Sequence, residues 1–356
     1  MSAGGSSPEQ IRCNIGEAIH DSDSDGERPA KRPRMDVVAV GDFVVDPIGL
    51  GTMPLGIEYP HPAQRPSRVA AISMLHQAFR SGVQMLDTAD SYCAGPGGSA
   101  EAAAPHYVER IIGEALRTFE GDASRIRVCT KGGFCRINNK SNGWRPASTS
   151  RSHVQKMIAK SHEALGGVRP IDVFMLHHAD GLSTGQLEGA LAAMQEAVNE
   201  GKVLCLGLAN ATIEHLKIAQ DLGCRISAVE NAFSLWQREA ELERPSGAAV
   251  TSKKGVLRWC AEKGVAFMPY GVLGGVQHRD GRRSLRESFP RLVELADARH
   301  VSPESLTLAW VRQRFPCVVH IVGARSLEHI LDCAGSRSLR LTTSEVDEIS
   351  SLKPAR

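Results

Sequence analysis

Asp87, Lys131 and His177 each come directly after a short apolar run, and Tyr92 follows Asp87 by five residues. Taken singly, each has a plain structural explanation: an aspartate can cap a turn, a lysine can end a strand in solvent, and a histidine can be a satisfied core residue. Charged groups are rarely buried unless they are paired. Their recurrence at the same position after three consecutive runs therefore indicates one shared site.

These four side chains suit proton transfer to a carbonyl group. A tyrosine with its ordinary pKa of about 10 is a poor acid near pH 7. A neighbouring lysine ammonium favours the phenolate and is expected to bring the pKa of Tyr92 toward the working range. Asp87 would hold Lys131 charged and oriented, and His177 would position a carbonyl oxygen opposite Tyr92. The set predicts a proton donor for a carbonyl that accepts hydride.

The elements that must position these groups alternate between apolar runs and helical patterns. Eight runs are predicted as strands: Pro47–Gly51, Gln84–Leu86, Ile126–Thr130, Ile171–Leu176, Val203–Leu208, Ile226–Val229, Val265–Pro269 and Val318–Val322. Helices are predicted between them, at Arg68–Arg80, Tyr107–Thr118, Ser152–Leu165, Gly185–Glu200, Ile213–Leu222, Val256–Glu262 and Pro303–Arg314. A β-hairpin is expected ahead of them at Val37–Val45, with its turn at Gly41-Asp42.

This α/β alternation fits a (β/α)8 TIM barrel, whose functional sites lie at the C-terminal ends of the strands. A doubly wound sheet is the alternative fold. No Gly-x-Gly-x-x-Gly opens a helix after the first strand, which disfavours that alternative. The stretch from Trp236 to Lys253 has no clear periodicity and is expected to form a long loop over the barrel mouth.

The first 36 residues differ in composition from the rest. They are polar, and an acidic run is followed by the basic run Arg28–Arg34. Too little apolar surface is present to offset the entropy of ordering, so we expect a disordered tail at residues 1–36 and a single barrel domain at residues 37–356. The basic run could act as a nuclear-localisation signal; the alternative is a solvated tail with no role.

Composition disfavours several classes of protein. The 356 residues carry a formal charge of only +2, which argues against a dedicated nucleic-acid binder. No apolar stretch approaches the ~20 residues that a membrane span needs. Nine scattered cysteines without a Cys-x-x-Cys pair favour neither a metal site nor a disulfide framework, and they suit a reducing compartment. We expect a cytoplasmic protein, and leave its oligomeric state open.

Several stretches resemble the signatures of the aldo-keto reductase family. In chain order they are Gly49–Met53, Leu86–Tyr92, Thr130–Gly133, Asp172–His177, Gly201–Asn210 and Val322–Ser326. The combination of Asp-Thr-Ala-x-x-Tyr with the later lysine and histidine is specific. The resemblance implies a (β/α)8 barrel that binds NADPH, with NADH as a second candidate. It also implies reduction of a small aldehyde or ketone, or the reverse oxidation of an alcohol.

The resemblance also implies roles for individual residues. Tyr92 would be the general acid/base, Lys131 and Asp87 would tune it, and His177 would orient the carbonyl. Among the cofactor-binding positions, Asn210 would hold the nicotinamide carboxamide and Tyr270 would stack on its ring. The full cofactor-binding set is Gly51, Thr52, Met53, Asp87, Asn210, Glu230, Tyr270, Gly271, Leu273, Gly275, Gly323, Arg325 and His329.

Some positions depart from the family pattern, mostly in the cofactor site. Ala209 replaces the usual serine, and Glu230 replaces the usual glutamine. Gly271-Val272 stands for the common Ser-Pro, and His329 and Cys333 stand where glutamine and asparagine usually touch the adenosine. Each lost neutral hydrogen bond costs about 0.5–1.5 kcal/mol.

Two further functions are therefore kept beside the reductase. One is a non-catalytic or regulatory relative that binds a cofactor or a partner. The other is a lyase that uses Lys131 as a Schiff-base amine. The loop residues expected to shape a substrate cleft are Cys93, Phe134, Arg136, Trp144, Phe233 and Trp236.

Overall fold

The computed structural model describes residues 37–57, 65–94, 99–137, 144–243, 249, 252–275, 284–324 and 326–355. The expected N-terminal tail at residues 1–36 lies outside these ranges, and so does Arg325. The disorder of the tail and the role of its basic run therefore stay predictions.

Eight parallel strands form one sheet that curls into a barrel. Their spatial order is β11-β10-β9-β8-β5-β4-β3-β12. A parallel bridge between Phe267 and Val318, with a 2.9 Å hydrogen bond from Val319 N to Phe267 O, brings the two edges together. The predicted TIM barrel is confirmed, with strands β3 (Ile48–Gly51), β4 (Met85–Asp87), β5 (Arg127–Gly132), β8 (Ile171–Leu176), β9 (Val203–Ala209), β10 (Ile226–Ala232), β11 (Ala266–Tyr270) and β12 (His320–Gly323).

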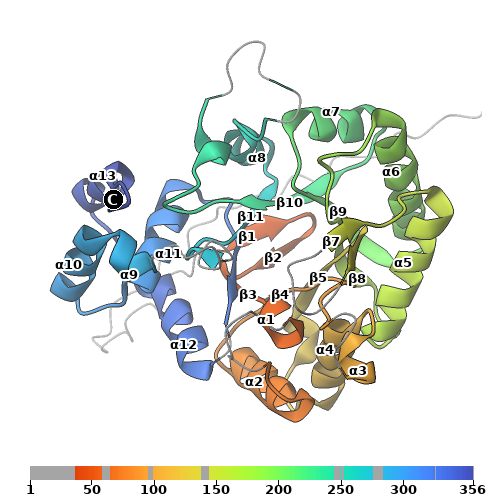
Figure 1. Cartoon of the computed structure of the whole chain (residues 1–356), viewed down its shortest axis with the longest axis horizontal. Helices are drawn as coiled ribbons and strands as arrows, with labels where there is room; N and C mark the ends of the chain where they lie inside the picture. The colour runs from red at the N-terminus through yellow and green to blue at the C-terminus, as the bar shows by residue number, and fades with distance from the viewer. Residues whose placement is uncertain are drawn as a thin grey trace, which may run out of the picture. The chain divides into compact units, whose positions relative to one another are not determined.

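Helices surround these strands (Figure 1). Three of them, α2, α4 and α11, have the bounds that the sequence predicts; α7 and α8 differ by one residue at one end, and α5 and α6 by one residue at both ends. The helices are α1 (Met53–Gly56), α2 (Arg68–Arg80), α3 (Ala100–Ala103), α4 (Tyr107–Thr118), α5 (Arg151–Ala164), α6 (Thr184–Asn199), α7 (Ile213–Asp221), α8 (Val256–Lys263), α9 (Leu285–Ser288), α10 (Pro290–Ala298), α11 (Pro303–Arg314), α12 (Leu327–Gly335) and α13 (Thr343–Ser351). Within the described ranges, no helix has the length and apolar content to cross a bilayer.

The expected hairpin packs against the N-terminal part of the barrel. Strands β1 (Val38–Val40) and β2 (Phe43–Val45) pair antiparallel around a turn at Gly41-Asp42. A Cβ atom at Gly41 would come within 2.4 Å of Cys205 Sγ on β9, so this turn lies directly against the barrel. A second hairpin, β6 (Phe134–Arg136) with β7 (Trp144–Pro146), follows β5 and was not predicted.

Alternation along the strands separates an apolar barrel interior from a charged rim. Side chains on a strand point to alternate faces, so residues two apart share one face. The interior cluster contains Met85 and Cys129 on neighbouring strands, together with Ala228 on β10. Asp87, Lys131 and Glu230 stand two residues further along the same strands. The strand phase therefore carries these three charged groups to the C-terminal end of the barrel interior.

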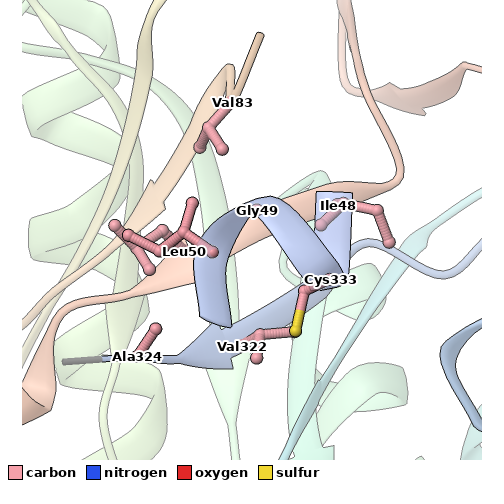
Figure 2. Close-up of a pocket in the computed structure, with 8 residues that line it drawn as sticks. Ile48, Gly49, Leu50, Val83, Val322, Ala324 and Cys333 are labelled. Atoms are coloured by element: carbon pink, nitrogen blue, oxygen red, sulfur yellow. The ribbon is translucent and has the colours of Figure 1, made fainter. Parts of the chain in front are cut away.

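A small cavity lies outside the barrel, between β3, β12 and α12 (Figure 2). Its volume is about 10 Å³, barely the room that one water molecule needs. Cys333 lines it with its side chain among aliphatic groups and is 2% exposed. Cys333 is therefore a core residue.

Candidate active site

The sequence predicts Asp87, Lys131 and His177 at the ends of strands, and the structure shows them at or near those ends. Asp87 is the last residue of β4, and His177 directly follows β8. Strand β5 is longer than predicted, so Lys131 is still paired within the sheet, opposite Met175 of β8. This fixes the backbone of Lys131 and sends its side chain into the barrel interior.

The Lys131 ammonium pairs with two carboxylates at once. Its Nζ lies 2.5 Å from Asp87 Oδ1 and 2.9 Å from Glu230 Oε2. The three side chains are almost completely buried, with exposed fractions of 0%, 4% and 5% for Lys131, Asp87 and Glu230. Burial lowers the pKa of Lys131, but the two carboxylates overcome this and raise it well above its ordinary value. Lys131 is therefore a permanent cation at the floor of the site.

Glu230 is held differently from an ordinary surface glutamate. Burial, together with the charge of Asp87, raises the pKa of Glu230 to about 8, against the opposing effect of Lys131. Cys129 lies beside this group, and its Sγ is within 4.8 Å of carboxylate oxygens of Asp87 and Glu230. Both carboxylates already pair with the ammonium, so a divalent cation here would be repelled by Lys131.

Tyr92 is brought to Lys131 by a loop fastened to β5. The backbone N–H groups of Thr88 and Asp90 donate to the carbonyls of Cys129 and Lys131, at 2.9 and 3.0 Å. Lys131 Nζ then lies 5.3 Å from the centroid of the Tyr92 ring. This loop is why the tyrosine of the Asp-x-x-x-x-Tyr spacing reaches the lysine of the next strand.

The expectation that Lys131 brings the pKa of Tyr92 toward neutrality is wrong. Burial raises the pKa of Tyr92 well above its ordinary value, and Lys131 only partly opposes this. The charges of Asp87 and Glu230 act in the same direction as burial. Tyr92 therefore remains a phenol at neutral pH, which is the protonation state that a proton donor needs.

His177 lies in an aromatic surround at the rim. The ring centroids of Tyr92, Phe134 and Trp144 are 6.0, 5.5 and 6.2 Å from that of His177. Burial, followed by the charges of Lys131 and His178, lowers the pKa of His177 well below its ordinary value. Its Nδ1 has no hydrogen-bond partner among the described residues. A neutral imidazole with an unused ring nitrogen therefore faces the same space as Tyr92.

Asn210 and Tyr270 form a second polar group beside the first. The Tyr270 hydroxyl donates to Asn210 Oδ1 at 2.8 Å, and Asn210 Nδ2 donates to the carbonyl of His177 at 3.1 Å. Lys253 reaches the same oxygen at 3.4 Å while pairing with Asp180 at 2.9 Å. Burial works to raise the pKa of Asp180, but hydrogen bonds from His178 and Lys253 hold it at about 2.

The other expected cofactor residues line the same end of the barrel. Gly51 pairs with Gly323 of β12 and with Asp87 of β4, and Thr52 Oγ1 donates to the Asp87 carbonyl at 2.8 Å. Met53 begins α1 directly afterwards. His329 lies in the first turn of α12, where its N–H donates to the capping Ser326 Oγ at 3.3 Å. Contacts within the described part of the chain do not join Met53 or His329 to the buried charges.

The turn after β11 offers backbone rather than side chains. Gly271 and Gly275 have φ of +69° and +47°, and a Cβ atom at either would meet nothing within 4 Å. Leu273 lies half-buried between them. Open space beside a glycine-rich turn lets main-chain N–H groups approach an anion, so this segment fits the pyrophosphate of the cofactor that the sequence resemblance implies.

Two loop aromatics expected at the substrate cleft pack against other aromatic side chains. Phe233 is completely buried and stacks on Trp310, so its assignment to the cleft is wrong. Trp236 packs edge-on against Phe289, 4.9 Å between ring centroids. Burial of the large Phe233 ring outweighs its exposure at a rim, whereas Trp236 is half-buried.

Three polar residues of the site were missed by the sequence analysis: His178, Asp180 and Lys253. The first two lie one and three residues after His177, just past the end of β8, a position that could have identified them. Lys253 belongs to the long aperiodic segment, whose local sequence carries no signal for the contact with Asp180.

This chain is similar in sequence to a known protein family and to individual proteins. Residues 47–354 match the model of the aldo/keto reductase family. A probable aldo-keto reductase of Glycine max is 26% identical over 336 residues, covering 88% of this chain and 86% of that protein. Pyridoxine 4-dehydrogenase of Escherichia coli is 27% identical over 279 residues, covering 77% of this chain and 84% of that protein.

Solved structures share the fold. An aldo-keto reductase from Klebsiella pneumoniae in complex with NADPH superimposes with a TM-score of 0.66 at 23% identity, covering 91% of this chain and 96% of that one. A likeness at this identity bears on the barrel architecture, which agrees with the strand order above.

Proposed function

Since this chain belongs to the aldo/keto reductase family of oxidoreductases, we propose that it reduces a small aldehyde or ketone to an alcohol, or catalyses the reverse oxidation, with NADPH as cofactor and Tyr92 as proton donor. The observation that carries this proposal is the group formed by Tyr92, Lys131, Asp87 and His177. A buried phenol, an ammonium 5.3 Å from its ring and a neutral imidazole share one space at the barrel rim.

Each of these residues has a chemical task in the proposed reaction. The cofactor, when bound, supplies a hydride for the carbonyl carbon. His177, kept neutral, donates an N–H to the carbonyl oxygen and orients it toward Tyr92. Tyr92 donates its hydroxyl proton to that oxygen, and the Lys131 ammonium stabilises the phenolate that results. Asp87 holds Lys131 in place through its 2.5 Å contact.

The residues proposed to hold the cofactor come from several segments of the chain. Asn210 and Tyr270 would meet the nicotinamide, and the turn of Gly271, Leu273 and Gly275 would meet the pyrophosphate. The remaining proposed contacts are Gly51, Thr52, Met53, Gly323, Arg325 and His329, of which Arg325 would pair with a 2′-phosphate. The NADPH bound by the Klebsiella pneumoniae enzyme supports the choice of cofactor. NADH is the second candidate.

The surround of His177 indicates the kind of substrate. Phe134 and Trp144 lie within 6.3 Å of each other, between ring centroids, and both face His177. Aromatic side chains of this kind favour an apolar or planar carbonyl compound over a strongly hydrated one. A cytoplasmic location, or a nuclear one through the basic run, remains a prediction.

The regulatory alternative is favoured by one observation. Asn210 Oδ1 already accepts hydrogen bonds from Tyr270 and Lys253, so a carboxamide must compete for it. A regulatory relative would bind the cofactor and catalyse no turnover. The lyase alternative is disfavoured, because a Schiff base needs an accessible neutral amine and Lys131 is fully buried between two carboxylates.

A panel of aldehydes and ketones, assayed with NADPH and then with NADH, tests the proposal. We expect turnover with NADPH that falls by about 10²-fold or more in Tyr92→Phe. The control is Tyr107→Phe, another buried tyrosine, whose ring packs under Arg65. Cofactor binding without turnover would support the regulatory alternative, and absence of both at millimolar cofactor would exclude the reductase.

A further inference from the structure

Glu230 makes a contact that its expected role does not account for. At the position of the family's usual glutamine, it was expected to bind the cofactor. Instead its Oε2 lies 2.9 Å from Lys131 Nζ, the same ammonium that Asp87 contacts at 2.5 Å. The two residues that meet are 99 positions apart, and both are buried. Glu230 is thus part of the proton-transfer group.

The charges of this buried group do not balance if every member is ionised. Asp87 and Glu230 have carboxylate oxygens within 4.8 Å of each other, and one ammonium lies against both. Full ionisation would leave one negative charge in excess away from water, which is costly. Two carboxyl groups that share a site retain a proton between them. A hydrogen bond between Asp87 and Glu230 acts in the same direction.

We propose that Glu230 keeps a proton in the working enzyme and acts with Asp87 as a positioning residue for Lys131, so that loss of this proton sets the alkaline limit of carbonyl reduction. We assign the proton to Glu230 because Asp87 makes the shorter contact with the ammonium. A protonated Glu230 has the charge of the glutamine it replaces. The inference rests on the proposed function, since it assigns a role within the same reaction.

The groups that face Glu230 come from several elements. Asp87 is on β4, Lys131 and Cys129 are on β5, and Tyr92 is in the loop after β4. Tyr270 on the neighbouring β11 also feels the charge of Glu230. Of these groups, Lys131 is the one that favours the ionised glutamate, and the others disfavour it or are neutral.

Ionisation of Glu230 affects Tyr92, the proposed proton donor, through the negative charge that it adds beside Tyr92 and Lys131. Its negative charge raises the pKa of Tyr92, in the same direction as burial. Proton donation leaves a phenolate on Tyr92, and a second carboxylate beside Lys131 opposes that phenolate. A lysine ammonium has three N–H donors, and the two carboxylates engage two of them. The protonated form of Glu230 therefore leaves the ammonium most able to stabilise Tyr92.

Infrared spectroscopy tests the protonation without any assay of activity. We expect the folded protein in D2O to show the C=O stretch of a neutral carboxylic acid, lost as the pH rises through about 8, the range set for Glu230. Labelling all glutamates with ¹³C should shift this band in the wild type, so the assignment does not depend on a variant that must fold. Glu230→Gln should remove the band. The buried Asp90, which titrates near 7, should show its own unshifted band in both proteins.

The second arm measures turnover against pH at saturating cofactor. The wild type should lose about tenfold in kcat between pH 7 and pH 9, as the fraction of protonated Glu230 falls by that factor. Glu230→Gln should lose less than twofold, and the exposed Glu188→Gln should behave as the wild type.

The infrared and turnover experiments distinguish failure of the role proposed for Glu230 from failure of the proposed reductase function. No glutamate band at any pH, or the same alkaline loss in Glu230→Gln, would overturn the role of Glu230 while leaving the reductase standing. A titrating band in a protein that reduces no carbonyl would instead refute the proposed function.

Discussion

The Tyr270 hydroxyl donates a 2.8 Å hydrogen bond to Asn210 Oδ1, across the end of β10. The two residues end or follow strands that do not touch each other, and both are proposed to meet the nicotinamide. Lys253 also donates to this oxygen, so both acceptor positions of Asn210 Oδ1 are used by groups of the protein itself. Cofactor binding must therefore replace at least one of these bonds.

Removal of the Tyr270 hydroxyl should strengthen cofactor binding. Tyr270→Phe keeps the ring for stacking and abolishes the competing bond, which is worth about 0.5–1.5 kcal/mol, or a two- to tenfold change in Kd. Tyr270→Ala loses the ring as well and should bind more weakly than the wild type. Fluorescence titration with NADPH measures both. Weaker binding by the phenylalanine variant would show that the hydroxyl serves the cofactor rather than competes with it.

Lys131 and Glu230 should be energetically coupled. Lys131→Met leaves the buried carboxyl groups without their cation and should destabilise the fold by about 3–5 kcal/mol. In the Glu230→Gln background the same change should cost less, because one of the two acids is gone. Urea unfolding of the four proteins at pH 8.5, where Glu230 is mostly ionised, gives the coupling directly. If the two changes in the free energy of unfolding were strictly additive, the 2.9 Å contact would contribute nothing to stability.

His177 should not limit turnover on the acid side. Burial, followed by the charges of Lys131 and His178, holds the pKa of His177 well below its ordinary value, so the ring is neutral in the range near pH 6.5 where a free imidazole titrates. His177→Phe should lower kcat/KM by about 10²-fold through loss of the N–H to the carbonyl oxygen. The pH profile of the wild type relative to a His177→Gln variant measures the titration. A fall below pH 7 that is absent from the glutamine variant would contradict this expectation.

Asp90 should make stability depend on pH. Burial, followed by the charge of Glu109, raises its pKa to about 7 from 3.8. Because the folded state binds this proton more tightly, the stability that it contributes is present at low pH and is lost as the pH rises toward 7. Between pH 5 and pH 8, Asp90→Asn should therefore gain about 2–3 kcal/mol in free energy of unfolding relative to the wild type. Urea unfolding at the two pH values measures it. An unchanged difference would place the native proton elsewhere.

Gly41 should tolerate no side chain. Its φ of +61° disfavours an L residue by about 1–2 kcal/mol, and a Cβ atom would also clash with Cys205 Sγ at 2.4 Å. Gly201→Ala is the matched control, with φ of +72° and open space around the added atom. Thermal or urea unfolding should rank Gly41→Ala as the less stable of the two. Equal losses would mean that the hairpin can move away from the barrel at no cost.

The local order of the chain was enough to predict the barrel and the position of the proposed catalytic residues. Alternation of apolar runs with helical patterns is a short-range property, and it gave strand Ile171–Leu176 and helix Arg68–Arg80 with their observed bounds. Placement of Asp87, Lys131 and His177 at one rim follows from parallel strands, whose C-terminal ends meet at the same side.

The tertiary structure determined the partners, the burial and the surrounding charges of those residues. The pairing of Lys131 with Glu230 spans 99 positions and depends on closure of the barrel, which no local pattern encodes. The β6–β7 hairpin brings Trp144 to His177, and an aperiodic segment brings Lys253 to Asp180. The direction of the pKa of Tyr92 was mispredicted for the same reason, because it depends on burial and on the number of charges around Lys131. Residue types and strand phase thus determined which groups meet at the rim, and the folded environment determined how many protons they keep.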